Sequence, residues 1–319
     1  MVSHEVNVMM SSYMETVGEE LLEDVCDIHL HLGPDVYERY TDEITMARQA
    51  QKAGYRALLF KNHHFPTAAR AELVARSVLG MEIFGGIVLN SPVGGINKHA
   101  VSAAIDFGAR EVWMPTLYSA FHIELVGEPN WPYPRVRPPV HKQPVPEGIR
   151  ILDSEGELVP DIHDILDMIA SADIILSTGH LYMQESKALV KEAAKAGVKK
   201  IVFTHTMGLE SSKTQRPGMP PRNPEMKDLE ELVSLGAYLE WDYGSTLAPT
   251  LRDPRLVADG VRKFGVERCL IVTDLGQAHN PSPVEGMRAF IKSLLMYGIS
   301  EKEVGILAKD NPSRLLGLD

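Results

Sequence analysis

The segment VCDIHLHLGPD, residues 25–35, decides the fold prediction. It begins as an apolar strand, and His29 and His31 lie one residue apart within it. Successive side chains of a strand point to opposite faces, so we expect both imidazoles on one face and Ile28 and Leu30 on the other. Neutral imidazoles that converge on one point suit a divalent metal. An isolated pair at this spacing is more often two buried, hydrogen-bonded histidines, so a metal site can be predicted only if other residues of the chain support it.

Strand-like segments alternate with amphipathic helical segments along the chain, which is typical of βα units around a parallel sheet. The predicted strands are residues 25–30, 56–61, 82–90, 111–115, 173–179, 200–205, 237–241 and 269–274. The predicted helices are residues 41–54, 98–109, 185–197, 225–236 and 254–265. Each helical segment has a glycine at or next to its end, as expected for a helix C-terminus. The pattern predicts a (β/α)8 TIM barrel over residues 25–319, preceded by an N-terminal extension at residues 1–24.

One region interrupts this alternation. Residues 118–160 are rich in proline, which disfavours regular helix, and IRILDSEGELVP reads as a β-hairpin that turns at residues 153–156. We therefore predict an insertion after the fourth strand, over the barrel mouth. A second long loop covers residues 208–224, and the C-terminal DNPSRLLGLD predicts a helix with Asn311 as N-cap and Pro312 at its first position.

Composition excludes several function classes. The chain has 319 residues, 44% of them hydrophobic, and a net charge of −11, which argues against a nucleic-acid-binding surface. No apolar run approaches the ~20 residues of a membrane span. The N-terminus does not resemble a signal peptide, so we expect a cytoplasmic protein. Cys26 and Cys269 are predicted to be packed thiols, and no glycine-rich nucleotide-binding motif occurs.

Three further predicted strands end in a residue that can bind metal. These residues are His180 in STGH, His205 in FTHT and Asp274 in VTDLG. Active sites of (β/α)8 barrels are assembled from the carboxyl ends of different strands. Together with His29 and His31, these residues predict a metal site at one end of the barrel.

The chain resembles the amidohydrolase superfamily from Asp27 to Leu318. The matching pieces are DIHLHLGPD, STGH, FTHT, VTDLG and the closing NPSRLLGL. The resemblance implies that His29 and His31 bind the more buried metal, that His180 and His205 bind a second metal or substrate, and that Asp274 is a ligand and proton acceptor. It further implies a hydrolase in which metal-bound hydroxide attacks an amide, cyclic amide, lactone or ester carbonyl. Zinc is the expected metal, with manganese, iron or cobalt as alternatives and one or two ions per chain.

The chain departs from the family pattern at the bridge between the metals. Members often place a carboxylated lysine or a glutamate at the end of the fourth strand, where this chain has EVWMPT. The nearest substitute is Lys61, at the end of the second strand. Three roles remain open for Lys61: a carboxylated metal bridge, an ammonium that acts in catalysis or binds substrate, and a surface salt bridge.

Residues in the surrounding loops are candidates for substrate binding. His63 and His64 follow the second strand, and we expect one to face the mouth and the other to face away. Further candidates are His122, Glu240, Arg216, Arg222, Arg135 and Arg137, although solvated side chains are the more common outcome at such positions. We expect a small-molecule substrate, with an anion favoured by the arginines.

Two other functions stay open at this point. Relatives with the same ligands can hold one metal and act as decarboxylases or hydratases, and the missing bridge keeps that alternative. The second alternative function is that of a barrel that has lost catalysis and only binds a ligand. The oligomeric state is open, with a homo-oligomer as one option.

Overall fold

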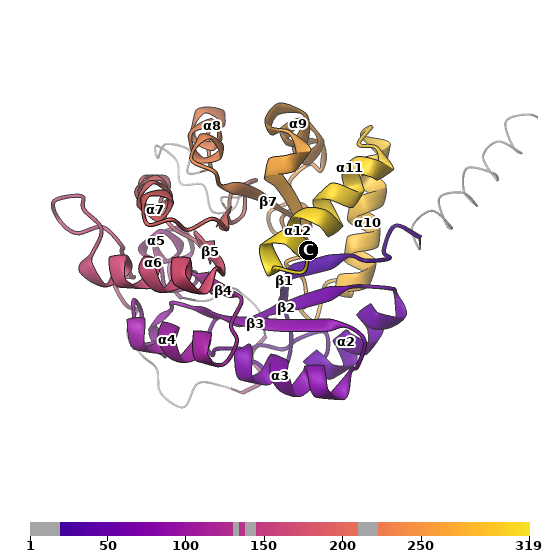
Figure 1. The fold of residues 1–319 in the computed structure, drawn as a ribbon, viewed down its shortest axis with the longest axis horizontal. Coiled ribbons are helices and arrows are strands. Elements are labelled where there is room, and N and C mark those ends of the chain that lie inside the picture. Colours follow the sequence, from indigo (N-terminus) through magenta and orange to yellow (C-terminus); the bar gives the residue numbers. More distant parts are fainter. Residues whose placement is uncertain (1–19, 130–133, 138–144, 210–222) are drawn as a thin grey trace, which may run out of the picture.

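The computed structural model describes residues 20–129, 134–137, 145–209 and 223–319. Eight parallel strands form one sheet in the order β1 to β8, and helices surround it (Figure 1). The strands are β1 (Cys26–His31), β2 (Ala57–Lys61), β3 (Glu82–Val88), β4 (Glu111–Trp113), β5 (Ile175–Ser177), β6 (Ile201–Phe203), β7 (Tyr238–Asp242) and β8 (Cys269–Val272). A parallel bridge between Leu30 and Leu275 brings β8 back to β1. The predicted (β/α)8 barrel is therefore confirmed.

Helices follow most strands and pack on the outside of the barrel. The α-helices are α2 (Glu43–Lys52), α3 (Ala68–Ser77), α4 (Lys98–Asp106), α5 (Ala120–Val126), α6 (Pro160–Ala172), α7 (Met183–Lys195), α8 (Met226–Ser234), α9 (Arg255–Phe264), α10 (Pro283–Met296), α11 (Glu301–Gly305) and α12 (Asn311–Leu316). Short helices of other types are η1 (Ser91–Val93), η2 (Gly244–Thr246), η3 (Val266–Arg268) and the π-helix η4 (Ile306–Asp310). The glycines predicted near helix ends have positive φ, as such positions require: Gly54, Gly108, Gly197, Gly236 and Gly265.

Apolar side chains form two separate clusters, one on each side of the sheet. The inner cluster takes residues from all eight strands, which only the inside of a barrel permits, and Leu315 and Leu316 of α12 join it. The outer cluster lies between the strands and the helices. Both cysteines are buried thiols, as predicted.

The first strand differs from the sequence prediction at Ile28. Leu30 packs in the outer cluster as expected, but Ile28 packs in the inner one. The pairing of β1 with β2 shifts register between Asp27 and Leu30, which is a β-bulge. A bulge interrupts the strict alternation of side chains and re-aims those that follow it.

The insertion after β4 is only partly irregular. It begins with the short helix α5, which the sequence did not predict. The predicted turn at residues 153–156 is present, but the flanking segments share a single antiparallel bridge between Leu152 and Leu158. Another bridge joins Tyr37, in the loop after β1, to Arg135. The insertion therefore reaches the loops at the carboxyl ends of the strands.

The C-terminal helix also differs from its prediction. Asn311 is not an N-cap, because η4 runs into α12 without a break. Its side-chain amide instead donates to the carbonyls of Val266 and Cys269, both at 2.7 Å. Asn311 therefore ties the C-terminal helix to the start of β8.

Among the described residues, no helix combines the length and apolarity needed to cross a membrane.

Candidate metal centre

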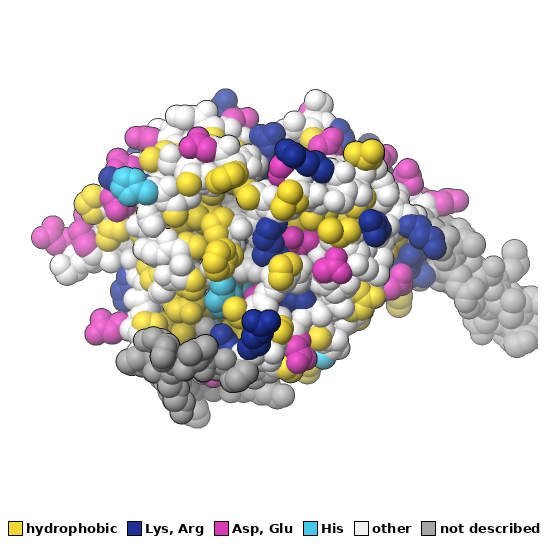
Figure 2. Space-filling view, turned by 90° about the horizontal axis from the view of Figure 1, so that it is seen from below, with side chains coloured by type: hydrophobic (Ala, Val, Ile, Leu, Met, Phe, Trp, Pro, Cys, Tyr) yellow, Lys and Arg dark blue, Asp and Glu magenta, His cyan; other side chains and the backbone are white. Residues whose placement is uncertain are grey.

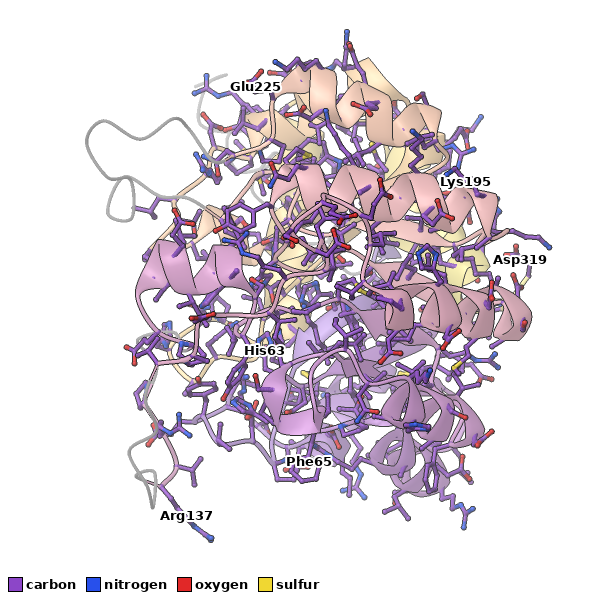
Figure 3. All side chains as sticks on the ribbon, turned by 90° about the vertical axis from the view of Figure 1, so that its left-hand side faces the viewer. His63, Phe65, Arg137, Lys195, Glu225 and Asp319 are labelled. Carbon is purple, nitrogen blue, oxygen red and sulfur yellow. The ribbon has the colours of Figure 1, made fainter. Side chains whose placement is uncertain are left out.

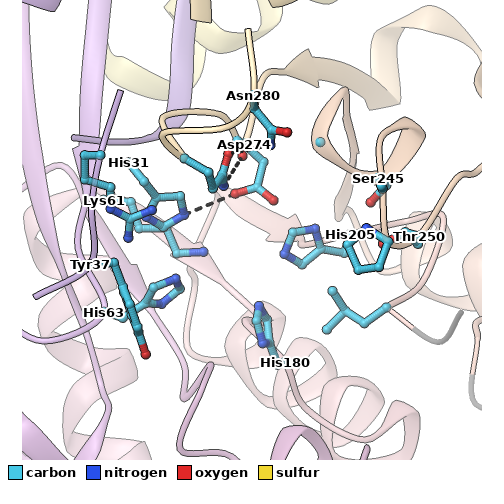
Figure 4. A pocket seen from close by; sticks show the side chains of 16 residues that line it. His31, Tyr37, Lys61, His63, His180, His205, Ser245, Thr250, Asp274 and Asn280 are labelled. Atoms are coloured by element: carbon cyan, nitrogen blue, oxygen red, sulfur yellow. Dashed lines mark hydrogen bonds and ion pairs between the residues drawn. The ribbon is translucent and has the colours of Figure 1, made fainter. Parts of the chain in front are cut away.

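Three predicted ligands converge at the carboxyl end of the barrel. The Nε2 atoms of His29 and His31 each lie 3.1 Å from the same oxygen, Oδ1 of Asp274. His205 approaches the same place, with its ring centroid 5.5 Å from that of His29. Figure 4 shows His31, His205 and Asp274 facing one another across the pocket. Strands β1, β6 and β8 thus deliver their terminal side chains to one point.

Two carboxylates of β7 orient two of these histidines. Oε1 of Glu240 lies 3.0 Å from Nδ1 of His29, and Oδ2 of Asp242 lies 3.1 Å from Nδ1 of His205. Residues two apart on a strand share a face, so one strand serves both histidines. A carboxylate on Nδ1 leaves Nε2 to bind a metal, a common arrangement around metal-ligating histidines.

These contacts change the role of Glu240 and add Asp242. Glu240 was predicted to bind substrate, but it is fully buried beneath His29 and does not line the pocket. Asp242 was missed, because the predicted strand ended one residue before it. Its signal in the sequence was the EWD triplet, which places two carboxylates on one face at a strand end.

The backbone at the site is strained in two places. His205 and Asp274 have positive φ angles of 57° and 49°, which side-chain-bearing residues rarely adopt. Such strain is found mainly where function requires a particular side-chain direction. Gly276 closes the turn beside Asp274, where a Cβ would lie 1.5 Å from the carbonyl oxygen of His31. No other residue fits there.

Lys61 is buried inside the barrel, with a relative exposure of 1%. Its Nζ lies 2.9 Å from Nε2 of His29 and 5.3 Å from the ring centroid of Trp113, which occupies the end of β4. Burial lowers the pKa of Lys61, against the raising effect of Asp274 and Glu240. The surface salt bridge considered for Lys61 is therefore wrong, whereas both roles at the metal site remain compatible with its position.

Three other histidines belong to the same region. His63 and His180 line the pocket, and His122 lies behind His180 with the two Nδ1 atoms 3.2 Å apart. His63 is held by Thr116, whose Oγ1 lies 2.9 Å from its Nδ1. His64 faces Asp35 instead and does not line this pocket, so one of the two adjacent histidines faces the mouth, as expected. His122 and His64, both predicted to bind substrate, are instead neighbours of residues that line the pocket.

The pKa values of the pocket histidines suit metal binding. Burial lowers the pKa of His31 to about 3 and holds those of His63 and His180 well below the usual value. Burial and Lys61 also lower the pKa of His29, but Glu240 and Asp274 outweigh them and raise it to about 10. The carboxylates around His29 thus favour a positive charge next to its ring, which a divalent cation supplies. Together with the neutral imidazoles, this donor set fits a metal ion.

The pocket beside these residues has a volume of about 50 Å³ and opens to solvent. Its described lining comes from the loops after β1, β2, β5, β6, β7 and β8: His31, Tyr37, Arg39, Lys61, His63, His180, His205, Leu209, Gly244, Ser245, Ala248, Pro249, Thr250, Asp274, Gln277 and Asn280. Arg39, Tyr37 and Gln277 were not predicted. Arg216 and Arg222 lie outside the described residues, and Arg137 extends away from the barrel (Figure 3).

Comparisons with known proteins agree with this fold. The sequence model of a family of unknown function (DUF6282) matches residues 24–240. No curated protein matches the sequence. The probable dipeptidase PvdM from Pseudomonas aeruginosa has a similar structure, with a TM-score of 0.62 and 11% identity over 96% of this chain and 98% of its own. An amidohydrolase from Pseudomonas aeruginosa has a TM-score of 0.60 and 14% identity over 94% and 98% of the two chains.

A mutant organophosphorus hydrolase from Deinococcus radiodurans is similar too, with a TM-score of 0.52 and 14% identity over 86% of this chain and 83% of its own. At such low identity, the likeness concerns the fold. The chain therefore has the fold of the amidohydrolase superfamily, as the sequence motifs implied.

Proposed function

This chain belongs to the DUF6282 family, whose function is unknown, and we propose that it is a metal-dependent hydrolase of amide, cyclic amide, lactone or ester bonds. The observation that carries the proposal is the convergence of His29, His31 and Asp274 on one point, with both Nε2 atoms 3.1 Å from Asp274 Oδ1. The structurally similar proteins include a probable dipeptidase and an amidohydrolase, which supports this class of reaction.

The proposed ligands are His29, His31 and Asp274, with His205 and His180 completing the site or facing the substrate. A divalent cation held there would make a nearby water more acidic and polarise a substrate carbonyl. Imidazole and carboxylate donors favour zinc, and manganese, iron or cobalt also accept them. We propose zinc as the native ion.

Asp274 is the proposed proton acceptor and shuttle. Burial would raise the pKa of its carboxyl, but His29 and the hydrogen bonds from His29 and His31 hold that pKa well below its usual range. The side chain is 20% exposed and lines the pocket, so it reaches both the metal site and a bound substrate. A carboxylate in this position can take a proton from water and pass it to the leaving group.

His205 and Lys61 are proposed to act beside Asp274. Asp242 fixes Nδ1 of His205, which directs Nε2 toward the pocket. Nζ of Lys61 lies 2.9 Å from His29 Nε2, where an ammonium would offset negative charge that builds up on the substrate. A carboxylated Lys61 would instead be a further ligand.

A second candidate is a decarboxylase or hydratase with one metal. It is favoured by Trp113, which fills the end of β4 where a bridging ligand would otherwise stand.

The test combines metal analysis with an activity screen. Elemental mass spectrometry of protein purified without chelator should find one or two equivalents of a divalent metal. Hydrolysis in a panel of amides, lactones and esters should disappear on metal removal and return when the metal is restored. Protein that stays metal-free even after supplementation would contradict the proposal, and a metal-dependent loss of carbon dioxide without hydrolysis would favour the second candidate.

A further inference from the structure

Arg39 is fixed at the edge of the pocket by a buried ion pair. Oδ2 of Asp35 accepts from Nε of Arg39 at 2.8 Å and lies 2.6 Å from its Nη2. The Arg39 side chain is 4% exposed and the Asp35 side chain is 0% exposed. Burial would raise the pKa of Asp35, but His64 and the Arg39 guanidinium hold it well below its usual range, so the aspartate stays ionised. A buried pair of this kind gives precise orientation more readily than stability.

The backbone fixes Arg39 to the metal centre as well. Arg39 pairs with Gln277 in an antiparallel bridge, and Tyr40 N donates to Gly276 O at 2.7 Å. These contacts join the loop after β1, which begins at His31, to the loop after β8, which contains Asp274. The backbone of Arg39 is therefore tied to the loop that carries Asp274, one of the proposed metal ligands.

The Arg39 guanidinium retains donors for a ligand. In the described part of the chain, Asp35 is its only hydrogen-bond acceptor, and Asp35 engages Nε and Nη2. The N–H groups of Nη1 therefore remain available to a ligand. Arg39 lines the pocket together with His31, His63 and Asp274. An arginine that is held in place by a carboxylate, here Asp35, is already oriented to bind an anion with its remaining donors.

A second arginine, Arg135, lies against the same tyrosine ring as Arg39. The Cζ atoms of Arg39 and Arg135 lie 5.6 and 5.4 Å from the centroid of the Tyr37 ring. Nε of Arg135 is buried and has no partner among the residues described. Figure 2 shows histidine atoms on this face with several Lys and Arg side chains nearby.

We propose that Arg39, held in place by Asp35, binds a carboxylate of the substrate next to the bond that is cleaved. This inference names the substrate class and rests on the proposed function. The Nη1 donors hold the carboxylate at one end of the pocket, while the scissile carbonyl lies near Asp274. Neutral analogues lose this contact and leave the guanidinium without its ligand. Arg39 is therefore a specificity-determining residue.

The test measures binding rather than turnover, with N-acetylglycine and its neutral analogue N-acetylglycinamide as probes in calorimetry. Wild-type protein should bind the acid about 10- to 100-fold more tightly than the amide, as expected for a hydrogen bond to a charged group. Arg39→Gln should reduce this ratio to near one, and Arg39→Lys should retain part of it. A ratio near one in wild type, or an unchanged ratio in Arg39→Gln, would overturn the proposal, because the carboxylate would then bind elsewhere.

Two controls separate recognition from folding. Arg39→Gln leaves Asp35 buried without its partner, so the double variant Asp35→Asn/Arg39→Gln removes the pair together and should show the same loss. Arg70→Gln breaks a similar two-nitrogen ion pair, with Glu43, between α2 and α3 and away from the pocket, and should leave the ratio unchanged.

The proposed hydrolysis is tested separately from this subsite. Asp274→Asn should abolish turnover and keep the preference for the acid. An Arg39-dependent preference in a protein that hydrolyses nothing would retain the subsite and refute the hydrolase. Hydrolysis of neutral and acidic substrates at equal rates would retain the hydrolase and refute the subsite.

Discussion

On β2, β7 and β8, the side chains that point into the barrel change character along each strand. Ala57 and Leu59 of β2 give way to Lys61, and Tyr238 of β7 gives way to Glu240 and Asp242. The amino-terminal half of the barrel interior is thus an apolar floor, closed by Leu315 and Leu316. The carboxyl-terminal half is a set of buried charged and polar groups.

This difference shows how the molecule separates stability from function. The floor follows the ordinary rules of hydrophobic packing, which contribute stability. The upper half buries ionisable groups, which costs stability unless each group is paired. The Glu240–His29 and Asp242–His205 pairs meet this need and at the same time fix the direction of two of the proposed metal-binding histidines. The following changes test the division.

The largest effect is expected for Asp274→Asn in the upper half. The amide cannot accept the proton from water and is a poorer metal ligand, so we expect hydrolytic kcat to fall by about three orders of magnitude. Steady-state kinetics on a substrate found in the screen would measure the change. Asp259→Asn, a 73% exposed aspartate on α9, is the matched control. Activity within a factor of a few of wild type in Asp274→Asn would remove Asp274 from the mechanism.

Glu240→Gln should weaken metal binding rather than chemistry alone. The neutral amide stabilises the His29 proton on Nδ1 less than the carboxylate does, and loss of such a partner typically lowers metal affinity about 10- to 100-fold. Competition with a chromophoric chelator would measure the affinity. The half-exposed Glu230 on α8 provides the control Glu230→Gln. Unchanged affinity would mean that Glu240 has no part in holding His29.

Leu315→Ala in the apolar floor should lower the stability of the protein and leave metal binding and catalysis unchanged. Removing a buried leucine side chain costs about 2–5 kcal/mol in the free energy of unfolding, because a cavity remains. Metal content and kcat should stay near wild type under conditions where the variant is folded. Urea unfolding and metal analysis would measure both, with Leu256→Ala on α9, 46% exposed, as the control. A floor variant that folds but loses its metal would show that the two halves are coupled.

Glu111→Gln is expected to have the smallest effect, at the boundary of the two halves. Burial raises the pKa of Glu111 to about 8 from a model-peptide value of 4.5, despite a hydrogen bond from Ser177. A carboxyl whose folded-state pKa is raised contributes stability below its unfolded pKa, and this contribution is lost as the pH rises through about 8. Glutamine imitates the neutral acid and should abolish that loss.

To test this prediction, the free energy of unfolding of wild type and of Glu111→Gln is measured at pH values below and above the titration of Glu111. Glu111→Gln should match wild type below the unfolded pKa and have the higher free energy of unfolding above the folded pKa. Glu72→Gln, with a 60% exposed side chain, should follow the wild-type pH dependence. Parallel curves for wild type and Glu111→Gln would mean that Glu111 is ionised throughout.

Local patterns were enough to predict the barrel and to place the proposed metal-binding residues at one end of it. Periodicity and glycine placement predicted all eight strands, and strand ends alone identified His180, His205 and Asp274 as neighbours of His29 and His31. These residues were predictable because a parallel barrel places the carboxyl ends of its strands together, whatever the loops do. The site residues that sequence reasoning missed or misassigned depend on side-chain direction, as Asp242, Glu240 and His122 show.

The sequence by itself therefore determined the fold class and the end of the barrel at which the ligands gather, because both follow from repeats of apolar strand, helix and glycine. Only the tertiary structure decided that Ile28 turns inward at a bulge, that Lys61 is buried against His29, and that Arg39 lines the pocket. Each of these depends on contacts between segments distant in the chain. Asp35 and Arg39 look like two surface charges in the sequence, and become a buried pair only when the loops after β1 and β8 close over them.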